Sequence, residues 1–346
     1  MKRWTSAVVL ACALATAASV ATPAAAAPTF SELPLLPGFS VAGAADINSS
    51  VVAVGEVSDN NGARAVRWAA DGAITALPGL PAAKRTHASA INENGTAIGT
   101  SDEKAVRWGA DGTVTALGSE GAMASYAHGI NDHDVVVGVH LKPGWISSGV
   151  KWDADGKVQV LEPYDTRADN TPTAINNSGV IAGHSGRQPI WWDANGKVRA
   201  LPTPQSYGRG ETSGINERGD ISGTIYFRDD ERAVTWIRDL PGEHGHEKVY
   251  RMEYLPLPPN ATHSRTTRIS DVGTVGWVQF GSATTHAVTW DADGQVTELG
   301  VPAGRADSAA NGISANGWIV GSARTEDPDK EIPAPAIRWA PTRPKR

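Results

Sequence analysis

The amino-acid sequence predicts an all-β protein, a single seven-bladed β-propeller of four-stranded blades. Three observations predict it: a repeated unit, seven tryptophans at one position of that unit with spacings of 40 to 54 residues, and turn residues that divide each unit into four short segments. Four strands in a repeat of this length are typical of blades that pack around a central channel. Solenoid repeats of similar length contain helices, and no segment here has a helical length and periodicity.

The repeat is clearest in residues 90–118, "AINENGTAIGTSDEKAVRWGADGTVTALG", and residues 174–202, "AINNSGVIAGHSGRQPIWWDANGKVRALP". The unit reads Ile-Asn, a turn, an apolar stretch ending in Gly, a variable loop, a stretch ending in Trp, an Asp/Asn-Gly turn and a stretch ending in Leu. The Ile-Asn step, twice replaced by Ile-Ser, defines seven units that start near residues 43, 88, 127, 172, 212, 266 and 310. The recurring tryptophans are Trp68, Trp108, Trp152, Trp192, Trp236, Trp290 and Trp339.

Each unit is expected to form four strands. In the second unit these are residues 87–91, 96–100, 105–108 and 114–117. The first turn has Asn92 at its first position, where the side chain caps the backbone, and Gly95 at its fourth, where positive φ is tolerated. Neighbouring blades cover both faces of a blade, which accounts for strands rich in Ala, Gly, Val and Ile. The repeated Trp is expected to wedge between adjacent blades.

The last unit lacks a fourth strand, because only "APTRPKR" follows Trp339. Residues 30–36, within "FSELPLLPG", have the pattern of that missing strand although no unit precedes them. We therefore expect the N-terminal segment to complete the C-terminal blade and close the ring by hydrogen bonds. The predicted propeller spans residues 28–341, and the basic residues 342–346 form a tail.

Residues 1–27 are expected to be a secretory signal peptide and the mature chain to be extracellular. They contain Lys2 and Arg3, an apolar run and small residues that suit cleavage. Cys12, the only cysteine, stands in "VLAC", but the apolar run continues past it, which disfavours a lipid-attachment box. No later segment is apolar enough for a membrane span. The net charge of −6 argues against general nucleic-acid binding.

The motif "A-x-x-I-N-x-x-G-x-x-x-G", followed by "HAVTW" at residues 286–290 and "D-G-x-V-x-x-L", resembles the HAF-type extracellular repeat family of bacteria. The resemblance covers essentially all of residues 30–340. This sequence departs from the family in having Val where Phe is frequent, and in keeping the histidine only at His286. The resemblance implies secretion and a propeller, and it implies no particular reaction.

Three local motifs suggest metal or adhesion sites, and each has a simpler explanation. The "DADG" and "DANG" segments look like parts of calcium loops, but they lack a third acid and stand where every unit needs a turn. "RGD" at residues 218–220 also falls in a turn whose glycine the fold requires. "EHGHE" in the 237–254 insertion carries His244 and His246, a weak candidate for zinc or copper, and an exposed polar loop is the simpler interpretation.

The strongest candidate site lies in the connections from the last strand of one unit to the first of the next. These emerge on one face of a propeller together with the loops between second and third strands. We expect their arginines, acids, histidines and tyrosines to form a ligand-binding ring at the channel mouth, since guanidinium and aromatic groups suit carboxylates, phosphates and sugars. Alternatively, the arginines pair with acids two residues on or with the next blade. The predicted ring comprises Arg85, His87, Tyr126, His128, Arg167, Asp169, Tyr207, Arg209, Glu211, His263, Arg265, Arg305 and Asp307.

The sequence favours a non-enzymatic binding or scaffold module for an extracellular or cell-envelope glycan, peptide or protein, acting as a monomer. Variable loops on a rigid repeat are typical of binding proteins. The alternative is a glycoside hydrolase or lyase that uses carboxylates at the channel mouth, although no nucleophile motif or distinctive acid pair stands out. No cofactor, nucleic-acid partner or stable membrane span is expected.

Overall fold

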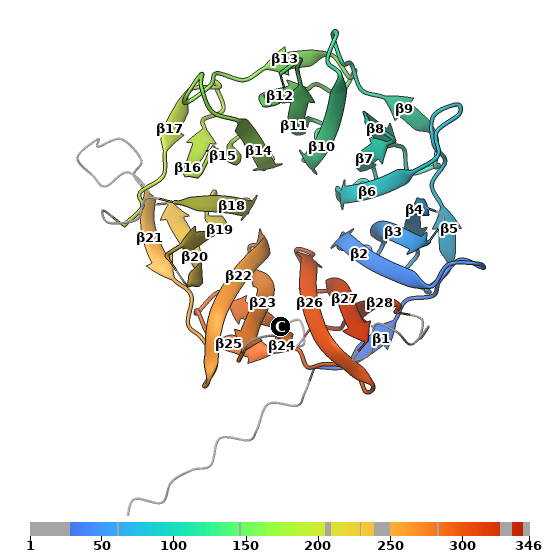
Figure 1. Cartoon of the computed structure of the whole chain (residues 1–346), viewed down its shortest axis with the longest axis vertical. Coiled ribbons are helices and arrows are strands. Elements are labelled where there is room, and N and C mark those ends of the chain that lie inside the picture. Colours follow the sequence, from blue (N-terminus) through green and yellow to red (C-terminus); the bar gives the residue numbers. More distant parts are fainter. Residues whose placement is uncertain are drawn as a thin grey trace, which may run out of the picture.

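The computed structural model is a ring of seven four-stranded antiparallel sheets around a central channel (Figure 1). It describes residues 28–341 except 61, 145–146, 205–208, 229, 239–249, 282–283 and 326–333. The described residues contain no helix that could cross a membrane. The predicted fold class, an all-β seven-bladed propeller, is confirmed.

Blade 1 contains β2 (Val41–Ile47), β3 (Ala53–Asp59), β4 (Gly62–Trp68) and β5 (Ile74–Ala76). Blade 2 contains β6 (Thr86–Ile91), β7 (Ala97–Ser101), β8 (Lys104–Trp108) and β9 (Val114–Ala116). Blade 3 contains β10 (Ala124–Ile130), β11 (Val136–Leu141), β12 (Ser147–Trp152) and β13 (Val158–Val160). Blade 4 contains β14 (Asn170–Ile175), β15 (Ile181–Ser185), β16 (Gln188–Trp192) and β17 (Val198–Ala200). Blade 5 contains β18 (Gly210–Ile215), β19 (Ile221–Tyr226), β20 (Glu231–Arg238) and β21 (Tyr250–Tyr254). Blade 6 contains β22 (Ala261–Ser270), β23 (Gly273–Phe280), β24 (Thr284–Asp291) and β25 (Val296–Glu298). Blade 7 contains β26 (Arg305–Ile313), β27 (Ile319–Thr325), β28 (Ala336–Trp339) and β1 (Phe30–Glu32).

Blade 7 is built from both ends of the chain, with the strand order β1-β28-β27-β26. Strand β1 lies beside β28 (Figure 1) and pairs with it antiparallel, with Phe30 opposite Trp339. The side chain of Leu33, just beyond β1, is 1% exposed, and its N–H donates to the carbonyl of Ala336. In the other blades the leucine after the fourth strand makes the same bond to the third strand; in blade 1, Leu77 donates to Ala65.

The second glycine of the repeat motif permits close packing of the first two strands of a blade. A Cβ on Gly99 would lie 1.9 Å from the carbonyl oxygen of His87, and one on Gly276 would lie 1.9 Å from that of Arg265. These distances are too short for any side chain, so only glycine is tolerated there. The first glycine serves the turn instead: Gly95 has φ +83°, a conformation that glycine adopts at little cost.

The seven repeated tryptophans are fully buried between neighbouring blades. In each, the indole Nε1–H donates over 2.7–3.0 Å to a carbonyl at the end of the preceding blade's fourth-strand segment. Trp68 of blade 1 donates to Pro34, which belongs to the N-terminal segment that completes blade 7. The expected wedge is therefore observed, and a directional hydrogen bond accompanies the apolar burial.

The asparagine of each Ile-Asn step joins successive blades. The Nδ2 groups of Asn48, Asn92, Asn131 and Asn176 each donate to the backbone carbonyl of the corresponding asparagine one blade on, over 3.0–3.1 Å. Their Oδ1 atoms accept N–H groups of their own turns, as in the 2.9 Å bond from Thr96 to Asn92. One residue type thus both closes a turn and fixes the next blade.

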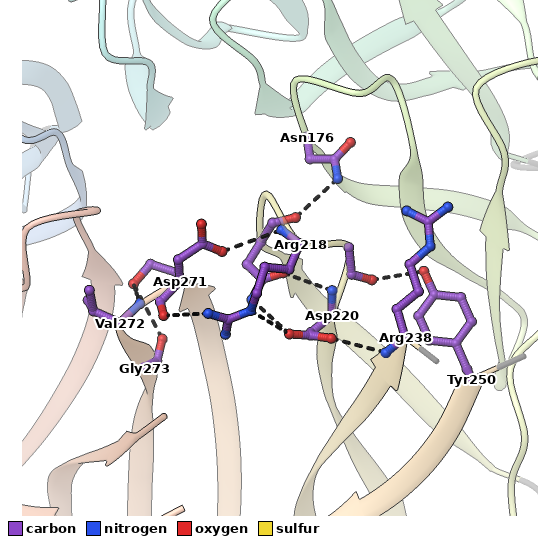
Figure 2. A network of polar contacts seen from close by, with 11 residues as sticks. Asn176, Arg218, Asp220, Arg238, Tyr250, Asp271, Val272 and Gly273 are labelled. Carbon is purple, nitrogen blue, oxygen red and sulfur yellow. Dashed lines mark hydrogen bonds and ion pairs between the residues drawn. The ribbon is translucent and has the colours of Figure 1, made fainter. Parts of the chain in front are cut away.

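The asparagine ladder changes between blades 5 and 6, where Ser270 replaces the next asparagine. Figure 2 shows the network around Arg218, Asp220 and Asp271 at this junction. Arg218 bridges this junction instead, because its Nη1 donates to the carbonyl of Asp271 over 2.9 Å and its Nε lies 3.1 Å from Oδ2 of Asp220. Asp220 is buried, and its Oδ1 accepts the N–H of Arg238. The "RGD" segment is therefore part of a structural network, and the simpler interpretation of this motif is the one that the contacts support.

Candidate functional site

The channel wall is formed by the first strands of the blades, and each contains a β-bulge two residues before the repeated isoleucine. In blade 1 this residue is Ala45. In the other six blades it is polar and hydrogen-bonds to the first strand of the next blade over 2.6–2.9 Å. A bulge redirects a side chain, and here it links the blades around the channel. These six residues are Ser89, His128, Thr173, Ser213, Thr267 and Asn311.

The five arginines of the predicted ring have different surroundings, so they do not form one cluster. Arg85 and Arg209 are exposed, and the side chain of Arg167 is 93% exposed, with Asp165 at 3.9 Å. Arg305 is largely buried and lies 3.9 Å from Glu32 of the closing strand β1. Arg265 alone among the five joins the cluster described below. The sequence could not distinguish these cases, because the connections differ in length and local course.

The acidic residues that were expected between the arginines of the ring mostly accept hydrogen bonds from backbone N–H groups. Asp169 accepts the N–H of Ser147 over 2.8 Å, and Asp307 accepts the N–H of Thr285 over 2.7 Å. Neither pairs with the arginine two residues before it, so the expected alternative of local ion pairs is wrong for these two acids. This capping role resembles that of asparagine in tight turns, where the side chain replaces a backbone acceptor.

The remaining members of the predicted ring are separate. His87 is exposed and lies 3.1 Å from Glu56 of blade 1, while Nδ1 of His263 lies 2.9 Å from the hydroxyl of Thr262. Tyr126 is half-buried on β10. Tyr207 and the metal candidates His244 and His246 lie outside the described residues.

Part of the predicted ring is brought together across blades 3 to 6, and we call this set the wall cluster. The hydroxyl of Tyr226 donates to Oε2 of Glu211 over 3.1 Å, and Nε of Arg265 donates to Oε2 of Glu231 over 2.6 Å. The guanidinium of Arg265 lies 5.3 Å from the ring centre of Tyr226 and 5.6 Å from that of Trp277. Two aromatic faces and one carboxylate therefore hold Arg265 in place. The members of the wall cluster are His128, His184, Glu211, Tyr226, Glu231 and Arg265.

The histidines of the wall cluster are held in their neutral form. Burial lowers the pKa of His184, and the carboxylates of Glu211 and Asp169 offset this only in part. Burial also lowers the pKa of His128, although Nδ1 of this residue hydrogen-bonds to the carbonyl of Pro172 at 2.9 Å. In contrast, Nδ1 of His184 is buried without a hydrogen-bond partner among the described residues. Buried polar atoms are normally paired, so this unpaired nitrogen is an exception in the cluster.

Burial and the nearby Glu211 raise the pKa of Tyr226 to about 12, so its hydroxyl stays protonated and remains a donor. Two neutral imidazoles, a phenol and a carboxylate thus supply both donors and acceptors at the face where the connections between blades emerge. His184, Tyr226 and the pairing of Glu231 were not predicted from the sequence. Their positions are the available signal: they lie at or next to the ends of strands β15, β19 and β20, and Glu211 lies at the start of β18.

The opposite end of the channel holds a cavity of about 190 Å³. Its lining includes an ion pair between Asp46 of blade 1 and Arg268 of blade 6, which are 3.0 Å apart. Burial raises the pKa of Asp46, against the lowering effect of Arg268. The sequence does hold a signal for this pair: the residue before the repeated isoleucine is Ala or Gly in the other five units.

The aspartates of the "DADG" segments organise hairpin turns, which is the simpler interpretation of these motifs. Oδ1 of Asp153 accepts the N–H groups of Asp155 and Lys157, and Oδ1 of Asp291 accepts those of Asp293 and Gln295. Within the part of the chain that the structure describes, no group of three histidines, cysteines or acids is placed to hold a metal.

Comparison with solved structures identifies other propellers. The chain resembles a catalytically inactive virginiamycin B lyase from Staphylococcus aureus, crystallised with quinupristin, at a TM-score of 0.57 and 13% identity over 90% of this chain and 99% of that one. It also resembles an oligogalacturonate lyase from Vibrio parahaemolyticus at a TM-score of 0.60 and 9% identity over 90% and 93% of the two chains. The β-propeller domain of the Trilobed protease from Pyrococcus furiosus gives a TM-score of 0.52 and 10% identity over 88% and 94%.

No protein-family model and no curated protein matches the sequence. At identities this low, the structural likeness concerns the fold and carries no residue roles from one protein to another. The chain is a β-propeller of the same general architecture as these lyases and this protease domain.

Proposed function

We propose that this protein is a secreted, non-enzymatic binding propeller and that its ligand contacts the wall cluster. The observation that carries the proposal is the buried Nδ1 of His184, which has no hydrogen-bond partner among the described residues. A buried polar atom without a partner is costly, and a ligand that hydrogen-bonds to it would remove that cost. The neighbouring Glu211 and Tyr226 add an acceptor and a donor in the same place.

The chemistry of the cluster favours a hydroxyl-rich ligand, such as a glycan of the cell envelope. The imidazoles are neutral and Arg265 is paired with Glu231, so the carboxylate that remains for a ligand is that of Glu211. Hydroxyl groups both donate and accept, which matches this mixture of neutral imidazole, phenol and carboxylate. Secretion is supported by the leader-like residues 1–27.

A glycan array and envelope extracts, probed with the purified chain from residue 28 onward, would test the proposal. We expect binding that weakens about tenfold or more in His184→Ala and Glu211→Gln. His133→Ala is the matched control, because His133 is exposed and belongs to the turn after β10, outside the wall cluster. Unchanged binding in both folded cluster variants would contradict the proposal.

A second function, proton abstraction in a lyase reaction, is favoured by one observation. His184 is a neutral imidazole with Glu211 among its charged neighbours, and a general base needs its unprotonated form near neutral pH. Two of the structurally similar propellers are lyases. Incubation with oligogalacturonates and other uronic-acid polymers, monitored for unsaturated products, would separate the functions. Turnover that disappears in His184→Ala would replace the binding proposal.

A further inference from the structure

At three of the seven junctions the residue before the repeated tryptophan is an arginine that reaches backbone carbonyls of the next blade. In blade 1 this residue is Arg67, whose guanidinium donates to the carbonyls of Gly95, Gly109 and Ala110 in the two turns of blade 2. The distances are 2.8–3.1 Å. One planar group thus satisfies three carbonyls that converge from two separate turns.

The next junction repeats this arrangement. Arg107 of blade 2 donates to the carbonyls of Asp134, Asp153 and Ala154, which occupy the corresponding positions in the turns of blade 3, over 2.6–3.0 Å. At the junction between blades 7 and 1, Arg338 donates to the carbonyl of Ala70 over 3.1 Å. The groove between blades is therefore a guanidinium site that the protein itself occupies at these junctions.

The junction between blades 3 and 4 lacks the arginine, because Lys151 stands before Trp152. The corresponding carbonyls belong to Gly179, Asp193 and Ala194, and these residues line an open groove of about 580 Å³ together with Lys151. No hydrogen bond or ion pair joins the ammonium of Lys151 to any residue that the structure describes. A lysine ammonium is a compact point charge and cannot span three carbonyls as the planar fork does.

We propose that this groove is a binding site for a guanidinium group, such as the arginine side chain of a partner polypeptide. The ligand would take the place that Arg67 and Arg107 occupy at the two preceding junctions. In the lining, Glu162 supplies a carboxylate beside Lys151 and Lys197, whereas the carboxylate of Asp193 is paired with Arg199 at 3.0 Å. The flexible stem of Lys151 can turn toward solvent and leave the carbonyls to the ligand.

The test uses Nα-acetyl-arginine amide as the probe, titrated into the folded chain and followed by NMR. Nα-acetyl-citrulline amide is the matched ligand, because its urea has nearly the same shape without the charge and with fewer donors. We expect the arginine probe to bind about tenfold more tightly than the citrulline probe. Equal affinity for the two probes would overturn the proposal.

Variants locate the site. Lys151→Arg should fill the groove, raise the melting temperature and weaken probe binding about tenfold, whereas Lys104→Arg, at the exposed start of β8, should change neither. Arg107→Lys should open the equivalent groove between blades 2 and 3 and add a second site for the arginine probe. Retention of full probe affinity in Lys151→Arg would overturn the proposal, as would a folded Arg107→Lys protein without a second site.

Discussion

Three histidines with lowered pKa values, His128, His140 and His184, connect single residues to the stability of the whole ring. Burial is the largest cause of the lowering in each case. His140 also lies against Trp152, with ring centres 5.4 Å apart, so its uncharged form suits an apolar contact. The folded protein thus binds protons at these positions less readily than the unfolded chain does.

This difference predicts that the free energy of unfolding falls as the pH drops below the unfolded histidine pKa of about 6.5. The free energy of unfolding falls because the histidines of the unfolded chain have the higher pKa. As the pH drops, the unfolded chain takes up protons before the folded protein does and is stabilised by them. Each unit of pKa difference is equivalent to about 1.4 kcal/mol. Urea unfolding between about pH 7.5 and 5.5 would measure the slope. The raised pKa values of Asp46 and Glu217 have the opposite effect on stability, so these acids cannot produce the expected fall.

The variant His184→Gln should reduce this pH dependence, because it removes one of the three titrating groups. His133→Gln, at an exposed position, should leave the slope as it is. If His184→Gln and the unchanged protein lose stability in parallel across the window, His184 does not titrate as its surroundings indicate.

At the scale of single elements, the fourth strand of each blade is the shortest or among the shortest. Six of the seven, including the closing strand β1, contain three residues, and β21 contains five. Short outer strands expose little unpaired backbone, which limits edge-to-edge association. Most of the contact that holds the fourth strand in its blade therefore comes from the leucine that follows this strand. In the closing segment this is Leu33, which is buried with Ala42, Val66 and Trp68.

We predict that Leu33→Ala lowers the free energy of unfolding by about 2–5 kcal/mol, the usual cost of removing a buried leucine side chain. Chemical denaturation would measure this loss. Leu77→Ala is the matched variant, because Leu77 occupies the same position in blade 1, where the strand is continuous with its blade. Phe30→Ala, at a residue that is 45% exposed, should cost much less. A Leu33→Ala protein as stable as the unchanged chain would show that the N-terminal segment contributes little to closure.

At the scale of the whole molecule, the two ends of the described chain meet in a position that other blades fill with a turn. The N–H of Ala340 donates to the carbonyl of Thr29 over 3.0 Å. In blade 1 the corresponding bond joins Ala69 to Ala73, and the three residues between them form the hairpin turn. Blade 7 therefore differs from its neighbours by one missing turn.

A circular permutant in which Ala-Asp-Gly joins Ala340 to Thr29 should restore this turn. New ends can be placed between Glu120 and Gly121, which lie in the exposed connection between β9 and β10. We expect the permutant to melt within a few degrees of the original chain, because closing one loop and opening another changes chain entropy little. A permutant that folds but melts far lower would indicate that the pairing of β1 with β28 requires free ends.

The sequence alone determined the repeat, the number of blades, the turn role of the recurring Asn and Gly and the packing role of the recurring Trp. The strands predicted in the second unit, 87–91, 96–100, 105–108 and 114–117, differ from β6 to β9 by about one residue at each end. This was possible because turn residues and one tryptophan recur in every unit, and a repeated signal is less ambiguous than a single one.

Only the tertiary structure decided which side chains from different blades meet. His184 and Arg265 belong to the wall cluster although they lie in separate units, and Asp46 reaches Arg268 from a blade that is not its sequence neighbour. Such contacts depend on how far each blade rotates around the axis and on the bulges that redirect side chains in the first strands. The bulges recur at one position of every unit, but the placement of one blade against another emerges only when all seven blades pack together. The sequence therefore specifies the ring, and the assembled ring specifies the site.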